Sequence, residues 1–450
     1  MGQLMRMYRQ QGLLLLLTCL YIQMFTGRQI LSVMIEPVKS EFAATDAQMG
    51  IVTGLAFALV FALLCLPAGR LVDRVNRTRL LAVCALIWAL ATWLGATVQT
   101  LGALIALRML IAFAEVPVAS ASISLISDVY PVSRRAFAIS IFSSAATFSA
   151  ILALSLGAYV VNQLGWRDSF MLVALPALPL ALMLWLTAEP ATHHEHRTSQ
   201  TANGQLALSL RQSLRLVWQD NRVRLLILAC ALGTMGSNAY AMWNTSFLVR
   251  HHDMTLQNAG LLAGIVGGGA SASGMLFSGW LADRHYGRPG PLRLAIIGNL
   301  LGFSALIIYL LFPAEYFVRL ADIRLPLAML ACAIAGFFSV FWVGPCMSVL
   351  TQMVSPQTRG VAVSLQTLLV TLLGFGVGPV IAGALSDKLT PVFADDALSV
   401  AIIVTNISVL IATLMLWWLQ RRYLDVSSPG QEQEKVDELT DTAGDCARQI

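Results

Sequence analysis

Charged residues are scarce in this sequence. Lys, Arg, Asp and Glu together make up 12% of the 450 residues, about half of the ~25% that is usual for soluble domains. Hydrophobic residues make up 57%, so a soluble fold of this length would lack the polar residues to cover its surface. The same apolar content excludes an intrinsically disordered chain, which has low hydrophobicity. These proportions predict an integral membrane protein with many spans.

Paired cysteines and the common catalytic motifs are also missing. The seven cysteines fall singly, with no CxxC pair, which argues against a disulfide framework and against a metal site. No HExxH, GxSxG or P-loop pattern occurs, so we expect a protein that is not an enzyme and holds no cofactor or metal. The cluster His193-His194-Glu195-His196 is interpreted as part of a solvated linker.

Long apolar runs are what the sequence has in abundance. A membrane-spanning helix needs ~20 apolar residues, and twelve runs bounded by charges, Gly or Pro reach about this length. They are 13–35, 46–68, 79–98, 101–126, 136–162, 168–188, 223–249, 256–281, 291–312, 325–351, 359–385 and 397–419. No A-x-A-like site closes the first run, so it is read as a span and not as a signal peptide. The predicted fold is an all-α integral membrane protein with twelve transmembrane helices in two pseudo-symmetric six-helix bundles.

The polar segments divide the chain into domains. We expect an N-terminal bundle of residues 1–188, a cytoplasmic linker of 189–222, a C-terminal bundle of 223–419 and a disordered cytoplasmic tail of 420–450. Within the linker, the pattern of Leu206–Trp218 favours an amphipathic helix on the membrane surface.

The basic residues predict the orientation. If the N-terminus is cytoplasmic, the inner segments carry 21 of the 29 Lys and Arg residues and the outer loops carry 6. Because cytoplasmic loops are enriched in these residues, we expect both termini inside, most simply at the inner membrane of a bacterium.

Two motifs repeat between the halves. Gly69-Arg-Leu-Val-Asp73-Arg74 recurs as Gly279-Trp-Leu-Ala-Asp283-Arg284, and Pro131-Val-Ser-Arg134 recurs as Pro356-Gln-Thr-Arg359. Each copy lies between the same two spans of its half, which is typical of the parallel duplication in major facilitator transporters.

The repeated loops predict a gate at the cytoplasmic face. Their glycines allow close helix approach, their aspartates can pair across the two halves, and their arginines can meet lipid headgroups. A plain cluster of topology-setting charges is the alternative. The candidate gating residues are Gly69, Asp73, Arg74, Arg77, Arg134, Gly279, Asp283, Arg284 and Arg359.

Three charged residues lie deep inside the predicted spans. Arg28 is in span one, and Arg108 and Glu115 are in span four, two helical turns apart on one face. Burying an ion in hydrocarbon is expensive unless it serves a pathway. We expect the two guanidiniums to bind an anionic group and Glu115 to exchange a proton. The alternative is a structural Arg108–Glu115 ion pair, with Arg28 extending its charge to the membrane surface.

The C-terminal half contains no such deep charge. Its candidate substrate contacts are polar or aromatic, and simple helix packing is the alternative for each. They are Asn238, Tyr240, Trp243, Asn244, Trp342 and Gln366. A charged wall that faces an apolar, aromatic wall suits an amphiphile.

The first 190 or so residues resemble the Spinster branch of the major facilitator transporters. The match includes the segments 28–39 and 46–50, the Gly69 loop, and Arg108-Met-Leu-Ile-Ala-Phe-Ala-Glu115. The resemblance implies that Arg28, Arg108 and Glu115 line a cavity and serve headgroup binding and proton coupling. This sequence departs from the family at Gly27, where the family has Asp, and in a less Gly-rich fourth span.

These observations predict a proton-coupled secondary transporter that works by alternating access. Its expected substrate is an anionic or zwitterionic amphiphile such as a lysophospholipid or sphingolipid. A transporter of small organic carboxylates or drug-like compounds is the alternative, and a non-transporting membrane sensor is a third. The expected partners are the substrate, protons and membrane lipids, without nucleic acid, and the protein is expected to be a monomer.

Overall fold

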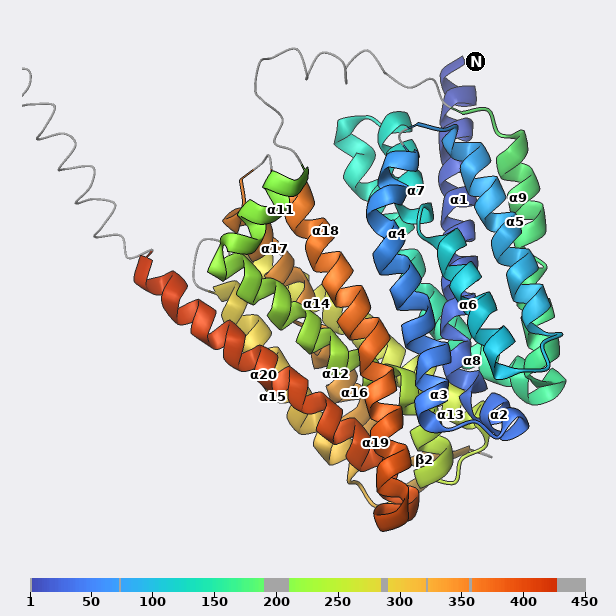
Figure 1. The fold of residues 1–450 in the computed structure, drawn as a ribbon, viewed down its shortest axis with the longest axis vertical. Coiled ribbons are helices and arrows are strands. Elements are labelled where there is room, and N and C mark those ends of the chain that lie inside the picture. The colour runs from blue at the N-terminus through green and yellow to red at the C-terminus, as the bar shows by residue number, and fades with distance from the viewer. Residues whose placement is uncertain are drawn as a thin grey trace, which may run out of the picture.

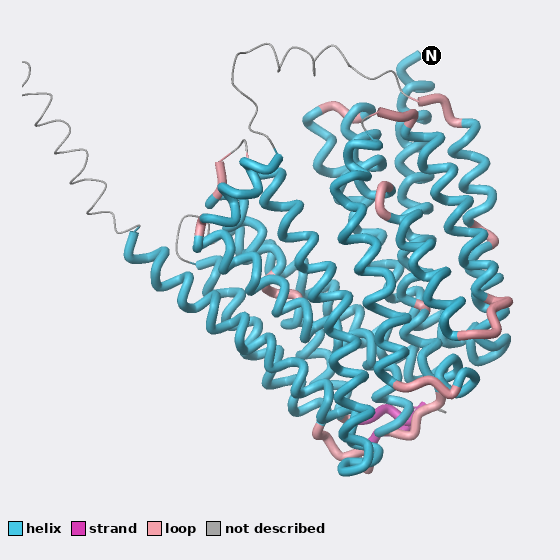
Figure 2. Tube along the Cα trace, viewed as in Figure 1, coloured by secondary structure: helices cyan, strands magenta, loops and turns pink. Residues whose placement is uncertain are grey.

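The computed structural model describes residues 2–72, 74–189, 210–284, 290–320, 323–355 and 358–426. Nearly all of them are helical (Figures 1 and 2). The predicted linker and tail fall largely outside this part of the chain, because residues 190–209 and 427–450 are not described.

The N-terminal half is built from helices alone. In chain order they are α1 (Gly2–Gln29), α2 (Leu31–Phe42), α3 (Asp46–Gly50), the π-helical η1 (Ile51–Leu55), α4 (Ala56–Val72), α5 (Arg77–Gly95), α6 (Leu101–Glu115), α7 (Val118–Val129), α8 (Val132–Ala174) and α9 (Ala177–Leu186).

The C-terminal half adds one small hairpin to its helices. In chain order its elements are α11 (Leu210–Gln219), α12 (Asn221–His251), α13 (Leu256–Leu262), η2 (Ala263–Gly268), α14 (Gly269–Arg284), α15 (Gly290–Leu310), β1 (Phe317–Leu320), β2 (Ile323–Pro326), α16 (Ala328–Ser339), α17 (Val343–Met353), α18 (Arg359–Leu369), η3 (Val370–Val377), α19 (Gly378–Phe393), η4 (Ala394–Asp396) and α20 (Ala397–Val426). The strands β1 and β2 pair antiparallel with Phe317 opposite Pro326. This hairpin departs from the predicted all-helical fold in a loop rich in β-branched and aromatic residues, which favour strands.

The helices account for the predicted spans. In the described residues, eleven helical segments are long and apolar enough to cross a membrane. The longest, 137–186, contains both the fifth and the sixth predicted span. The chain turns between those two spans at Gly165, whose φ of 80° lies in the left-handed region that glycine tolerates. Twelve crossings therefore agree with the prediction.

Several spans are broken near their middle. Span four consists of α6 and α7, separated at Pro117, which has no N–H to donate to the preceding helical turn. As a result α6 ends at Glu115, in the interior of the span. Spans two, eight and eleven instead contain the π-helical stretches η1, η2 and η3, a feature often found at functional sites.

The amphipathic helix predicted in the linker is present as α11. Ser213 and Val217 are buried, and the helix packs on α12 and α18. Leu216 and Trp218, the two neighbours of Val217 in the chain, are exposed.

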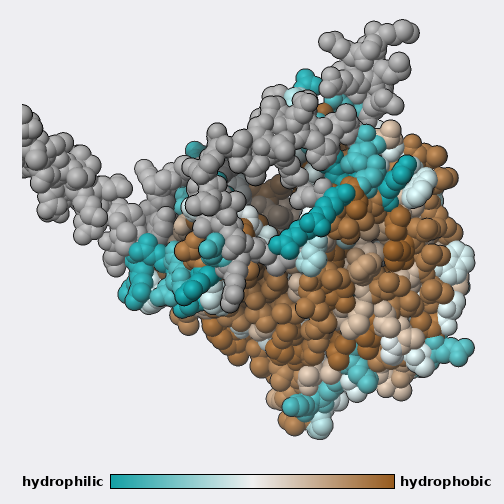
Figure 3. Space-filling view, turned by 45° about the horizontal axis from the view of Figure 1, so that its top comes forward, coloured by the Kyte–Doolittle hydropathy of each residue, from teal (hydrophilic) through white to brown (hydrophobic). Residues whose placement is uncertain are grey.

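The molecule has an apolar flank between two polar ends. Figure 3 shows hydrophobic residues over the side of the bundle, with hydrophilic residues at its ends. Many of the exposed residues on the helices are Leu, Phe, Ile and Trp. Such a surface suits lipid and not water, which agrees with an integral membrane protein.

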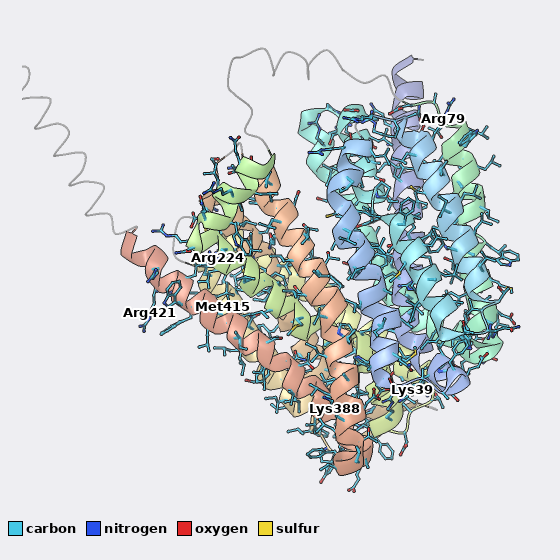
Figure 4. The ribbon with its side chains drawn as sticks, in the orientation of Figure 1. Lys39, Arg79, Arg224, Lys388, Met415 and Arg421 are labelled. Carbon is cyan, nitrogen blue, oxygen red and sulfur yellow. The ribbon has the colours of Figure 1, made fainter. Side chains whose placement is uncertain are left out.

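The two halves meet at one end only. We call the end where α1 starts and α4 ends the terminal face, and the other end, with α3 and the β-hairpin, the opposite face. The halves lie together at the opposite face and spread apart toward the terminal face (Figure 1). Figure 4 places Lys39 and Lys388, one from each half, at the opposite face and Arg79 at the terminal face.

Glycines allow the close approach at the opposite face. A Cβ on Gly54 of η1 would lie 2.6 Å from the Phe375 carbonyl oxygen of η3. A Cβ on Gly50 would lie equally close to the Pro379 carbonyl oxygen, 2.6 Å away. Real Cβ atoms do not sit so near a backbone oxygen, so any larger residue would separate the two halves here.

Gly54→Ala should therefore weaken the closed arrangement of the opposite face. Overpacking of this kind costs ~1–3 kcal/mol, which corresponds to a shift of roughly 5- to 150-fold toward molecules open at that face. Electron–electron distance measurements between spin labels at Gln99 and Glu315 would report this shift. The control is Gly102→Ala, because a Cβ on Gly102 would meet nothing within 4 Å. Equal distance distributions for both variants would contradict the prediction.

Candidate functional site

The three deep charges predicted from the sequence lie near one another in the N-terminal half. Arg108 and Glu115 are both buried on α6, with exposed fractions of 1% and 8%. The guanidinium carbon of Arg28, on α1, lies 4.2 Å from the centre of the Phe57 ring of α4. The guanidinium carbon of Arg108 lies 5.9 Å from the same ring. A single phenyl ring thus serves both cations through cation–π attraction.

The Arg108 guanidinium has no hydrogen-bond partner. Its Nε and both Nη atoms are buried without an acceptor, although a guanidinium offers five N–H donors. A buried charge without a partner is costly. The arrangement is therefore electrostatically complete only when an acceptor group enters.

Glu115 does not neutralise either arginine by direct contact. Its Oε1 atom accepts a hydrogen bond from Trp88 Nε1 on α5, at 3.0 Å. Among the described residues, no ion pair joins Glu115 to Arg28 or Arg108. The alternative of a structural Arg108–Glu115 ion pair is not formed. Nor does Arg28 extend to the membrane surface, because its guanidinium lies between the rings of Phe57 and Phe375.

A cavity of about 450 Å³ lies beside this cluster. It is lined by residues of both halves, and none of its lining residues is charged. Phe375 of η3 belongs to the lining, and its ring centre is 4.7 Å from the guanidinium carbon of Arg28. Gln29, the neighbour of Arg28, also lines the cavity. The cationic cluster and the uncharged cavity are thus adjacent compartments with a phenyl ring between them.

The predicted contacts of the C-terminal half divide into two groups. Asn238, Tyr240, Asn244 and Trp342 line the cavity. Trp243 does not line it, being fully buried with its Nε1 donating to the Pro379 carbonyl, 3.1 Å away. Gln366 is also outside the lining and is buried on α18, with its Oε1 unpaired.

The cavity wall in this half presents a free amide donor. Tyr309 donates to Asn244 Oδ1 at 2.7 Å, and the Asn244 side chain also hydrogen-bonds to the Cys332 thiol. Asn238 Nδ2 is shielded from solvent and has no hydrogen-bond partner. The Tyr240 hydroxyl lies 3.2 Å from the Cys332 thiol. This wall can donate hydrogen bonds to a neutral or anionic oxygen.

Among the described side chains, no ion pair joins the candidate gating residues of one half to those of the other. Arg74, Arg134, Arg284 and Arg359 are exposed, and a Cβ on Gly69 would meet nothing within 4 Å. Gly279 packs closely within its own half, where a Cβ on Gly344 would lie 3.6 Å from its Cα. Asp73 lies outside the described residues, and so does the side chain of Asp283.

Arg77 differs from the other candidate gating residues because it is buried and paired. It forms ion pairs with Asp128 at 2.6 Å and Glu189 at 2.7 Å, and donates to Ser124 at 2.7 Å. All of these partners belong to the N-terminal half or its last loop. Arg77 therefore ties α5, α7 and the end of the half together.

An ionic network that sequence reasoning missed closes the opposite face. We call it the Asp46 network. The buried Asp46 carboxylate binds Arg250 of α12 at 2.8 and 2.9 Å and Lys39 at 2.5 Å. Arg250 also pairs with Glu36 at 2.7 Å.

Two residues of α19 complete the Asp46 network. The Ser386 hydroxyl donates to Asp46 Oδ2 at 2.7 Å. The Asp387 carboxylate accepts the backbone N–H groups of Asp46 and Ala47, both at 2.8 Å, and so caps α3 from the other half. The sequence analysis treats Lys39 and Arg250 as loop charges and does not single out Ser386 or Asp387, because nothing in the sequence shows that these residues meet.

Comparison with known proteins identifies related chains. The sequence matches the Major Facilitator Superfamily over residues 17–375. An MFS-type efflux pump of Mycolicibacterium smegmatis is 25% identical over 88% of this chain and 89% of its own. A probable sulfoacetate transporter of Cupriavidus necator is 25% identical over 61% of this chain and 65% of its own. A bacterial homologue of the human lysosomal transporter Spinster, solved in an inward-facing, unoccupied conformation, has a TM-score of 0.81 at 24% identity, covering 93% of this chain and 98% of its own.

Arg250→Gln should open the opposite face. The substitution leaves the buried Asp46 with Lys39 as its only cation, and losing one partner of such a pair costs ~2 kcal/mol or more, about a thirty-fold change in population. The measurement is the rate at which an external maleimide modifies a cysteine placed at Ser32, beside the cavity, which should rise. Arg167→Gln is the matched control, because Arg167 pairs with Glu41 at 2.5 Å inside the N-terminal half. The prediction is wrong if both variants are modified at the same rate.

Proposed function

This chain belongs to the Major Facilitator Superfamily, and on that premise we propose that it is a proton-coupled secondary transporter of an anionic or zwitterionic amphiphile. Lysophospholipids and sphingolipids are the substrate classes meant. Arg28 and Arg108 bind the headgroup, the uncharged cavity takes the apolar part, and Glu115 exchanges the proton. Members of this family are transporters and not enzymes.

The observation that carries this proposal is the unpaired Arg108 guanidinium. Two buried or half-buried cations share the Phe57 ring, and neither forms an ion pair with Glu115 among those found in the described residues. A phosphate or carboxylate oxygen would supply the missing acceptors, since guanidinium groups match their geometry. A carboxylate that is free of ion pairs can gain or lose a proton without releasing a guanidinium, which favours Glu115 as the proton site.

The cavity supports a substrate with an apolar part. It contains Met242, Trp342, Val343 and Phe375 and no charged side chain, and ligand pockets of this size class are mostly apolar.

A second candidate is a small organic carboxylate or a drug-like compound. The unpaired amide donor of Asn238 favours it, because it could bind a further oxygen of a compact polar substrate. The probable sulfoacetate transporter among the relatives points the same way. Binding that does not depend on tail length would select this candidate over the amphiphile.

Alternating access would take the protein between the present arrangement, closed at the opposite face, and one that is closed at the terminal face instead. We take the terminal face as cytoplasmic from the excess of Lys and Arg on that side, which places the open end inside and both termini in the cytoplasm of a bacterium. The bundles of residues 1–188 and 223–419 would then rock as a monomer. The loops with Gly69, Asp73 and Arg74 and with Gly279, Asp283 and Arg284 would close the inner face when the Asp46 network opens.

Glu115→Gln should abolish proton movement. In proteoliposomes with an internal pH-sensitive dye, lysophospholipids, sphingoid lipids and small carboxylates would be added in turn to the wild type and the variant. The expected result is acidification or alkalinisation with wild type and at least a tenfold lower rate with the variant, because an amide cannot release a proton. The matched control is Glu315→Gln, an exposed glutamate of the opposite face. Equal substrate flux without proton movement in all three proteins would identify a uniporter, and binding without flux would identify a sensor.

Arg108→Gln should weaken binding of the anionic head. Loss of a charge-assisted contact costs ~1.5–3 kcal/mol, or roughly a 10- to 150-fold higher dissociation constant. Isothermal titration with substrates of one headgroup and different tails would show a similar loss for every tail length. A loss that appears only for long tails would contradict the assignment of Arg108 to the head.

A further inference from the structure

Trp88 is the one hydrogen-bond donor to Glu115 among the described residues. Its side chain on α5 is 1% exposed, and its Nε1 lies 3.0 Å from Glu115 Oε1. A neutral donor of this kind stabilises the ionised carboxylate without adding a charge. It also fixes the direction of the carboxylate within the site.

The Trp88 ring occupies space that exists only because residue 27 is glycine. A Cβ on Gly27 would overlap the Cζ2 atom of Trp88 and lie 2.9 Å from its Cη2 atom. These atoms form the edge of the ring that adjoins Nε1. Any side chain at position 27 would therefore push aside the same edge that donates to Glu115.

The two residues join the cationic and acidic parts of the site. Gly27 precedes Arg28 on α1. The same turn of this helix therefore carries the Arg28 guanidinium and leaves room for the Trp88 indole. The indole spans from α1 to the end of α6, where Glu115 lies.

We propose that Gly27 and Trp88 are positioning residues that hold Glu115 away from the guanidiniums and set the pH at which it exchanges its proton. The inference rests on the proposed function, in which Glu115 is the proton site. The charged and titratable groups near Glu115 are Arg28 and Tyr21 on α1 and Arg108 on α6. Because Trp88 is a neutral donor, both arginines stay free for the substrate. The specificity for an anionic head thus depends on an uncharged pair of residues that touches no substrate.

Trp88→Phe tests the proposal by removing the donor while keeping an aromatic ring. The readout is the infrared carbonyl band of protonated Glu115, identified by its absence in Glu115→Gln and titrated against pH in the full-length protein. Without the donor the ionised form is less stable, so the midpoint should move upward by about one pH unit. The matched control is Trp93→Phe, the same change at an exposed tryptophan of the same helix, which should leave the midpoint unchanged.

Gly27→Ala gives a second test that leaves the indole in the protein. The added methyl group displaces the ring, so the midpoint should move in the same direction as in Trp88→Phe. In the double variant the two shifts should not add, because both act through the same hydrogen bond. This variant decides the question if Trp88→Phe is too unstable to titrate.

The outcomes separate the inference from the proposed function. If no carbonyl band distinguishes the wild type from Glu115→Gln at any pH, Glu115 is not a proton site and the proposed coupling fails. If the band is present but its midpoint is the same in Trp88→Phe, Gly27→Ala and Trp93→Phe, the positioning role is overturned while the coupling role stands. Fully additive shifts in the double variant would also overturn it.

Discussion

Asp46 is the residue on which the observed arrangement of the two halves depends. Its carboxylate lies inside the protein with an exposed fraction of 2% and binds Arg250, Lys39 and Ser386. Its own backbone N–H is bound by Asp387 from the other half. A buried carboxylate is costly without such partners. The ion pair with Arg250 and the hydrogen bonds with Ser386 and Asp387 therefore hold α12 and α19 against α3. The glycines beside it then permit η1 and η3 to touch, and the halves spread apart toward the terminal face.

The buried arginines have two kinds of surroundings: some form ion pairs with acidic residues, and one does not. Arg250 is fully paired with acids and holds the closed face together. Arg77 is likewise paired, with Asp128 and Glu189, and stabilises one half. Arg108 is the exception, since it is more deeply buried than either and has no acceptor at all. Arg250 and Arg77 form ion pairs with acids of the protein itself, whereas Arg108 forms none, and this contrast is the basis for the proposal that Arg108 binds a ligand.

The sequence predicted the parts of this picture that depend on local pattern. The twelve spans followed from apolar runs, the two halves from repeated loops, and the Arg108–Glu115 face from a spacing of two helical turns. The missing parts depend on contacts between distant segments. Arg250 and Asp46 are 204 residues apart, and each alone resembles an ordinary loop charge. Trp88 likewise resembles any aromatic residue of a span, and its role emerges only when Gly27 and Glu115 are placed beside it.

All buried charges of the described residues belong to the N-terminal half. They are Asp46, Arg77, Arg108 and Glu115. The cluster of Arg28, Arg108 and Glu115 has a net charge of +1 when Glu115 is ionised and of +2 when Glu115 is protonated. Moving a full charge across a membrane potential of 100 mV is worth ~2.3 kcal/mol. In the proposed rocking motion, a membrane voltage would therefore act on the buried charges of the first half. An anion bound at the proposed site would reduce the charge that moves, so the loaded and empty carriers would respond differently to the same voltage.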